Sequence, residues 1–205
     1  MKKILVLLCF IISQTTFAGV AEDSSLNVSC KRNPLFCQIC KFNPHANKKW
    51  AMKLSNLLYQ YGKEYHMDPW RSLAIAMQES SLKNQSRKRK VLIYYDFCEK
   101  NTCVKKYQYV EGLSDVGLFQ FHVNTLIHHK INPLRLAADL DYSVKQHFLL
   151  LSKKQKQCQS LGKNAWACYH SKTKRHRDKY VKLVNRYFID KKLRGVKERS
   201  NNNHI

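Results

Sequence analysis

The sequence contains no hydrophobic run long enough to cross a membrane. The apolar run at residues 4–12 is shorter than the roughly 20 apolar residues that a spanning helix needs, and no later stretch approaches that length. Lys2 and Lys3 precede this run, and small residues follow it up to Ala18, which is the three-part layout of a secretory signal. We therefore expect a signal peptide over residues 1–18 and an exported chain without a transmembrane segment.

Acidic residues are also scarce. The chain has 14 Asp and Glu against 37 Lys and Arg, which gives a formal net charge of +23. This balance favours a polyanionic partner or surroundings. No aromatic stacking module or recognition-helix pattern is present, so we expect no nucleic-acid partner. An exported protein meets anionic cell-wall polymer and lipid headgroups first, so the charge indicates either wall binding or a solvated basic face that maintains solubility.

A metal-binding pattern is missing as well. His122, His128 and His129 are not accompanied by a Glu-x-x-His or His-x-x-x-His pair, and the two adjacent histidines cannot face the same side of a helix. We interpret all three as surface histidines. The sequence therefore predicts neither a metal nor a cofactor.

The cysteine count becomes odd once the signal peptide is removed. Without Cys9, seven of the eight cysteines remain, which suits an oxidising compartment and predicts three disulfides and one free thiol. Cys98 and Cys103 flank a short polar segment and are expected to pair. Cys158 and Cys168 are expected to form a second bridge.

Three cysteines near the start of the exported chain leave two interpretations open. Cys30, Cys37 and Cys40 could form one disulfide and leave one thiol, or they could bind zinc with His45 as a fourth ligand. The secreted context favours the disulfide.

The chain has no internal repeat and is long enough for one domain with a sizeable hydrophobic core. We expect a cysteine-containing arm over residues 19–46, one domain over residues 47–190 and a mobile basic tail over residues 191–205. Apolar positions at helical spacing predict helices, and two runs rich in Val, Ile, Tyr and Phe predict a hairpin. The predicted helices cover about residues 46–65, 68–82, 118–127, 132–153, 164–169 and 177–190, and the predicted strands cover residues 91–97 and 104–110.

Glu79 is the main candidate for chemistry. Ile75 precedes it by four residues and Leu82 follows it by three, so the carboxylate shares a helix face with apolar side chains. A partly dehydrated carboxyl has a raised pKa, which is what a proton donor needs near neutral pH. The alternative is that Glu79 lies near a helix end and points into water.

Three segments together indicate a family. Residues 74–80 read Ala-Ile-Ala-Met-Gln-Glu-Ser, residues 114–121 read Ser-Asp-Val-Gly-Leu-Phe-Gln-Phe, and residues 165–171 read Ala-Trp-Ala-Cys-Tyr-His-Ser. In this order they resemble the Glu-Ser helix, the Gly-Leu-Met-Gln segment and the Ala-Tyr-Asn-Ala-Gly segment of the lysozyme-like lytic transglycosylases. The resemblance covers about residues 50–188 and is nearest to the small transglycosylases that accompany secretion and conjugation machines.

The resemblance implies a mainly α, lysozyme-like α+β fold with a small β-hairpin and disulfides. The substrate groove would lie between the Glu79 helix and the hairpin insertion at about residues 86–113, which would form one wall. The Cys98–Cys103 bridge would brace that wall, and the Cys158–Cys168 bridge would brace the segment that carries Tyr169.

The resemblance also implies roles for single residues. Glu79 would act as both acid and base, with no second carboxylate, and would give 1,6-anhydro-muramyl products from the β-1,4-linked glycan. Tyr169 would hydrogen-bond near the Glu79 carboxylate. The implied substrate-binding residues are Ser80, Asp115, Gly117, Gln120 and Tyr169. The implied partners are peptidoglycan strands in the periplasm and a secretion or conjugation machine, and we expect a monomer.

Two departures from the family pattern keep alternatives open. His170 and Ser171 stand where the family has Asn and a small residue, and we interpret His170 as a surface histidine in a basic loop. Asp115 keeps a muramidase open as an alternative, because retaining glycosidases use two carboxylates about 5 Å apart. A non-catalytic wall-binding protein is the third possibility.

Overall fold

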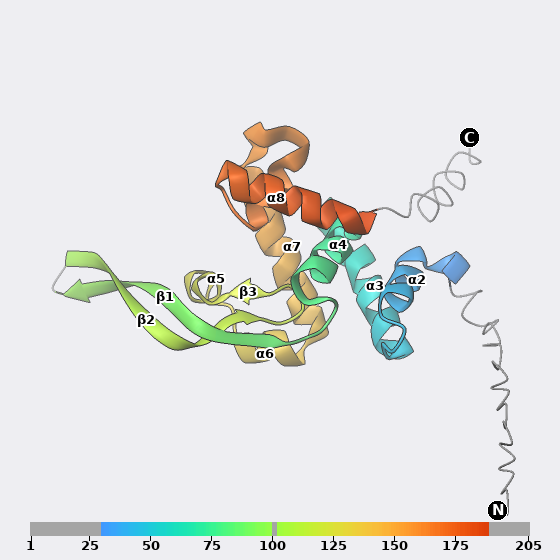
Figure 1. The fold of residues 1–205 in the computed structure, drawn as a ribbon, viewed down its shortest axis with the longest axis horizontal. Coiled ribbons are helices and arrows are strands. Elements are labelled where there is room, and N and C mark those ends of the chain that lie inside the picture. The colour runs from blue at the N-terminus through green and yellow to red at the C-terminus, as the bar shows by residue number, and fades with distance from the viewer. Residues whose placement is uncertain (1–29, 100–101, 189–205) are drawn as a thin grey trace, which may run out of the picture.

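The computed structural model describes residues 30–99 and 102–188, which form a mainly helical domain with one small antiparallel sheet (Figure 1). The predicted mainly α class with a hairpin and disulfides is thereby confirmed. The predicted signal peptide and the predicted tail at residues 191–205 lie outside the described residues. Within the described part of the chain, no helix is long and apolar enough to cross a bilayer.

The N-terminal arm contains a helix that the sequence did not predict. Helix α2 (Pro34–Phe42) begins after Asn33, whose side chain accepts a hydrogen bond from the Phe36 N–H. The Asn33 amide nitrogen also donates to Ser55 Oγ at 2.8 Å, which holds α2 against the next helix. Sequence periodicity missed α2 because it is short and its apolar residues are interrupted by two cysteines.

Two predicted helices lie at the centre of the domain. Helix α3 (Lys48–Glu64) and helix α4 (Pro69–Ser80) agree with the predicted ranges to within a few residues. Asp68 caps α4 by accepting from the Trp70 N–H, and Pro69 occupies the first helical position, where its missing N–H costs nothing. Because α4 ends at Ser80, Glu79 lies in its last turn.

The hairpin is longer than predicted. Strands β1 (Ser86–Glu99) and β2 (Thr102–Val116) pair along their whole length, and β3 (Phe121–His122) adds a short third strand to the base of β2. An irregularity in the register at Arg87 and Lys88 leaves Ser114 unpaired, which is the pattern of a β-bulge. The outer part of the hairpin projects well beyond the helices (Figure 1).

Two predictions for the region after the hairpin are wrong. The predicted helix over residues 118–127 is instead a turn, strand β3 and then helix α5 (Val123–His129). The predicted long helix over residues 132–153 is two helices, α6 (Pro133–Ala138) and α7 (Leu140–Gln157). Asp139 is extended and caps α7 by accepting from the Tyr142 N–H, so capping overrides the continuous apolar periodicity.

The C-terminal part returns to α4. A 3-10 helix, η1 (Gln159–Tyr169), packs against α7, and helix α8 (Lys174–Asn185) packs against both η1 and α4 before the short η2 (Arg186–Phe188). The last predicted helix therefore begins three residues earlier than predicted. This arrangement brings α8 alongside the Glu79 helix (Figure 1).

The disulfides follow the predicted pairs. Cys98–Cys103 and Cys158–Cys168 are both bridged, and Cys30–Cys37 forms a third bridge that leaves Cys40 as a thiol. This confirms the predicted pairs and the interpretation of the N-terminal cysteines as one bridge and one leftover thiol. The expected bracing of the groove by Cys98–Cys103 is wrong, because that bridge lies at the outer end of the hairpin, opposite its base.

Candidate active site

A groove of about 340 Å³ lies between the end of α4, the base of the hairpin, the start of α5 and the end of η1. This is the predicted position, between the Glu79 helix and the hairpin. Four segments that are far apart in the sequence meet there because α8 and η1 fold back onto α4 and α7. The groove is lined by Glu79, Arg87, Arg89, Asp115, Gln120, Phe121, His122, Thr125, Leu150, Tyr169 and His170.

Glu79 is held in an environment that raises the pKa of its carboxyl to about 7. Its side chain is 19 % exposed. Burial raises the pKa of Glu79 from 4.5 to about 7, the hydrogen bond from Tyr180 opposes this rise, the charge of Asp115 adds to it, and Arg87 opposes it. The expectation of a partly dehydrated carboxyl on an apolar helix face therefore agrees with the structure.

The hydroxyl next to Glu79 belongs to Tyr180 and not to the predicted Tyr169. Tyr180 Oη donates to Glu79 Oε1 at 2.6 Å, whereas Tyr169 Oη donates to the Phe119 carbonyl oxygen at 3.3 Å. Burial and the Glu79 carboxylate both raise the pKa of each tyrosine, so both hydroxyls stay protonated and can donate. Tyr169 still lines the groove.

Tyr180 lies on the buried face of α8 with Val184 and had no predicted role in the site. It is 2 % exposed, and a hydroxyl buried to this degree needs a hydrogen-bond partner. A tyrosine among Leu and Val on a buried stripe is therefore a signal for a polar partner. The sequence does not say which one, because α4 and α8 are about one hundred residues apart.

His170 is also part of the site. Its side chain is 45 % exposed, as expected of a surface histidine, yet its ring stacks on Tyr180 with centroids 4.3 Å apart. His170 Nδ1 lies 4.0 Å from Glu79 Oε1. Burial and the neighbouring His176 lower the pKa of His170, which favours the neutral imidazole. His170 is therefore a surface histidine, as predicted, and it also lines the groove.

Asp115 lies in the same groove, but its side chain contacts residues of β1 and β2. Its Oδ2 atom accepts from Ser114 Oγ at 2.8 Å and pairs with Arg89 Nη2 at 3.0 Å. Arg87, on the same strand as Arg89, donates instead to the backbone carbonyl of Glu79 at 3.1 Å. The two arginines had no predicted role, although the hairpin insertion was expected to form this wall.

The predicted Gly-Leu-Phe-Gln segment forms a tight turn whose last residue, Gln120, lines the groove. Gly117 has φ +79°, a conformation that favours glycine, and its N–H donates to the Gln85 carbonyl oxygen. Gln120 also has positive φ, and its Nε2 atom donates to the carbonyl oxygens of Gln85 and Gly117 at 2.8 and 2.7 Å. Gln120 lines the groove, but its amide nitrogen is used to hold this turn.

Ser80 is the one predicted substrate-binding residue that points into the protein. It is 2 % exposed, and its Oγ donates to the Ala76 carbonyl oxygen at 3.0 Å, a common bond for a serine inside a helix. The structure thus brings Glu79, Asp115, Gln120 and Tyr169 to the groove, places Gly117 at the start of the turn that ends at Gln120, and leaves Ser80 buried.

The groove can supply a proton to a bound oxygen atom and take one back. A carboxyl with a pKa of about 7 is protonated in about half of the molecules at neutral pH, which suits general acid and base chemistry. Among residues 30–99 and 102–188, no group of three or more His, Cys, Asp and Glu side chains is placed to hold a metal ion. Comparison with protein-family models, curated proteins and solved structures found no match.

Proposed function

We propose that this chain is a peptidoglycan lytic transglycosylase that uses Glu79 as its only catalytic acid and base. The observation that carries the proposal is the Glu79 carboxyl: it lines an open groove, its pKa is raised to about 7 by burial, and it accepts a hydrogen bond from Tyr180. The order of the three family-like segments supports a glycan strand as the substrate.

In the proposed reaction, protonated Glu79 gives its proton to the glycosidic oxygen while the bond to the muramic acid carbon breaks. The acetamido group of the same sugar supports the positive charge. The Glu79 carboxylate then takes the proton from the 6-hydroxyl, whose oxygen closes the 1,6-anhydro ring. Tyr180 donates to Glu79 Oε1 and so stabilises the carboxylate during the interval in which it carries charge.

The alternative is a muramidase in which Asp115 supports the cation or captures it and water completes the reaction. In favour of it, Asp115 lines the same groove and its charge acts on Glu79. Against it, the Asp115 carboxylate is already paired with Arg89 and hydrogen-bonded to Ser114, which reduces its capacity to act as a nucleophile. The lyase needs no second carboxylate.

Mass spectrometry of fragments released from purified sacculi tests the proposal. The lyase gives 1,6-anhydro ends, whereas the muramidase gives reducing ends about 18 mass units heavier through the added water. Glu79→Gln should abolish release, and Asp115→Asn should cost far less than Glu79→Gln. Asp178→Asn, which removes a partly exposed acid on α8, is the matched control.

The outcomes separate the three candidates. Mainly reducing ends, with Asp115→Asn as harmful as Glu79→Gln, would establish the muramidase. Binding to sacculi without any release would indicate a wall-binding protein. A periplasmic location and a secretion or conjugation machine as partner belong to the same proposal. The three disulfides are compatible with export, and the partner is inferred from the resemblance alone.

A further inference from the structure

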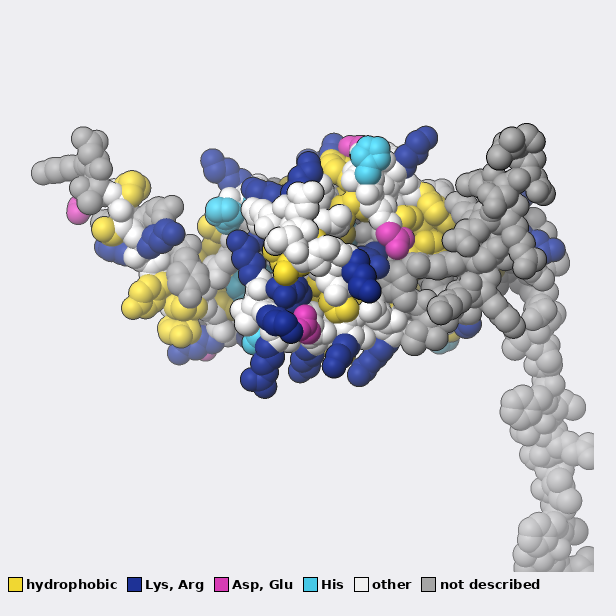
Figure 2. Space-filling view, turned by 90° about the horizontal axis from the view of Figure 1, so that it is seen from above, with side chains coloured by type: hydrophobic (Ala, Val, Ile, Leu, Met, Phe, Trp, Pro, Cys, Tyr) yellow, Lys and Arg dark blue, Asp and Glu magenta, His cyan; other side chains and the backbone are white. Residues whose placement is uncertain are grey.

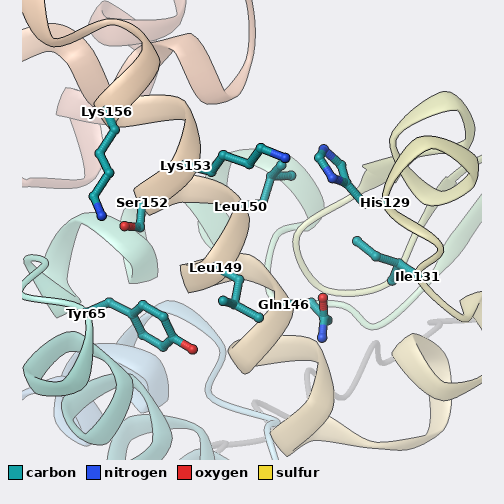
Figure 3. Close-up of a pocket in the computed structure, with 9 residues that line it drawn as sticks. All are labelled: Tyr65, His129, Ile131, Gln146, Leu149, Leu150, Ser152, Lys153 and Lys156. Atoms are coloured by element: carbon teal, nitrogen blue, oxygen red, sulfur yellow. The ribbon is translucent and has the colours of Figure 1, made fainter.

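A second pocket of about 480 Å³ is lined by residues of α5 and α7 together with Tyr65 and Ile131 (Figure 3). Leu150 of α7 lines both cavities. On α5, Thr125 lines the groove and His129, four residues later and therefore one turn further along the same face, lines the second pocket. A ligand lying in the groove could thus extend a branch past Leu150 into this pocket.

The second pocket combines an apolar floor with a cationic rim. Ile131, Leu149 and Leu150 supply the apolar surface, and Leu149 remains 41 % exposed. Lys153 and Lys156 stand on the rim, and Lys153 extends from α7 toward the α5 side of the pocket (Figure 3). No Asp or Glu is among the described residues that line it.

The positive charges around this pocket repel one another. Burial lowers the pKa of His129, and the charges of Lys153, His128 and Lys154 lower it further. Burial also lowers the pKa of Lys154, and Lys172 and Lys153 add to that effect. A bound anion would relieve this repulsion, because opposite charge favours the protonated form of each group.

We propose that this pocket binds the peptide stem of the glycan strand, with a free carboxylate of the stem on Lys153 and Lys156 and its alanine methyl groups on Leu149 and Ile131. This inference rests on the proposed function, since the stem branches from a sugar in the groove. A stem offers both small apolar groups and free carboxylates, which match the floor and the rim. The pocket then makes the enzyme selective for strands that still carry their stems.

Calorimetry tests the pocket without requiring cleavage. The titrant is a synthetic stem tetrapeptide with free carboxylates, and the protein is the mature chain carrying Glu79→Gln. Lys153→Gln with Lys156→Gln should weaken binding roughly tenfold, as expected for the loss of charge-assisted hydrogen bonds. Lys53→Gln with Lys163→Gln is the control of equal charge, because both lysines are exposed and outside the pocket.

A fully amidated stem peptide should bind weakly to all three proteins. Equal affinity of the two double variants for the free peptide would overturn the inference. This readout stands even if the chain proves unable to cut glycan, in which case the proposed function fails and the pocket remains a stem-binding site.

Cleavage assays give an independent check. On intact sacculi, the Lys153 and Lys156 double variant should release fragments with a higher KM than the control double variant. On strands whose stems have been removed by an amidase, the two should release fragments equally well. Normal release by both variants from both substrates would refute the inference while leaving the lyase intact.

Discussion

The carboxyl of Glu79 is subject to two opposing influences. Burial against the apolar end of α4 disfavours its charge, and the hydrogen bond from Tyr180 favours it. Burial is the larger influence, so the group is a proton donor at neutral pH. The hydrogen bond limits the rise in pKa and keeps the carboxylate accessible as a base.

The pH dependence of kcat/KM should report this balance. Because the reaction begins with protonated Glu79, kcat/KM should fall above pH about 7. Tyr180→Phe removes the bond that favours the charged form, so the falling limb should move to higher pH by about one unit. Tyr187→Phe is the control. If the falling limb does not move in Tyr180→Phe, that limb does not report the ionisation of Glu79.

The pH dependence of the free energy of unfolding should also report the raised pKa of Glu79. Below pH 4.5, Glu79 is protonated in both the folded and the unfolded chain. Between pH 4.5 and about 7, Glu79 ionises in the unfolded chain but stays largely protonated in the folded one, so the folded state loses stability as the pH rises. Glu79→Gln removes this penalty and should stabilise the protein at pH 8 by about 3 kcal/mol more than at pH 4. Urea denaturation at both values measures it, and equal effects at both would show that the pKa is not raised.

Among the elements, the two predicted disulfides differ in their relation to the site. Cys158–Cys168 ties the end of α7 to η1, directly before Tyr169 and His170. Cys98–Cys103 closes the hairpin, nine residues beyond Arg89, which lines the groove, and is therefore about 30 Å from the groove along the strand at roughly 3.3 Å per residue. Only the first bridge can position groove residues.

Removing the two bridges should therefore have different effects. Cys158→Ser with Cys168→Ser should lower the free energy of unfolding by about 3 kcal/mol, from the entropy of the opened loop, and reduce kcat. Cys98→Ser with Cys103→Ser should leave kcat near its original value. Thermal unfolding and sacculus digestion measure both effects, and equal loss of kcat in both variants would contradict this assignment.

At the scale of the whole molecule, the positive charge is spread widely. Lys and Arg side chains are scattered over the face seen in Figure 2, and acidic side chains are fewer there. Hydrophobic and basic side chains gather on the projecting hairpin at the left of that view, where Val104, Tyr107 and Tyr109 are exposed. This excess of positive charge is compatible with the anionic polymer of the proposed function.

Binding of the Glu79→Gln chain to sacculi should weaken strongly between 0.1 and 1 M salt, because the screening length falls from about 10 Å to about 3 Å. A pelleting assay measures the bound fraction. Sacculi whose carboxylates have been amidated are the control and should bind weakly at either concentration. Binding that is insensitive to salt would favour the interpretation of a solvated basic face.

Much of the local structure could be predicted because its causes are local. Asp68 before Pro69 marks the start of α4, and the spacing of Ile75, Glu79 and Leu82 indicates a carboxyl on an apolar face. The close pairs of cysteines also indicated their own partners. The division of residues 132–153 into two helices was missed because the cap at Asp139 competes with apolar periodicity, and short-range signals do not decide between them.

The sequence by itself indicated Glu79 as the candidate acid, how its helix begins and where the hairpin lies. Only the tertiary structure decided which groups surround that carboxyl. Tyr180 and His170 reach Glu79 because α8 packs on α4 and η1 packs on α7, and such contacts join positions about one hundred residues apart. They depend on side-chain packing across the core, and periodicity along the chain contains no information about which helices will meet.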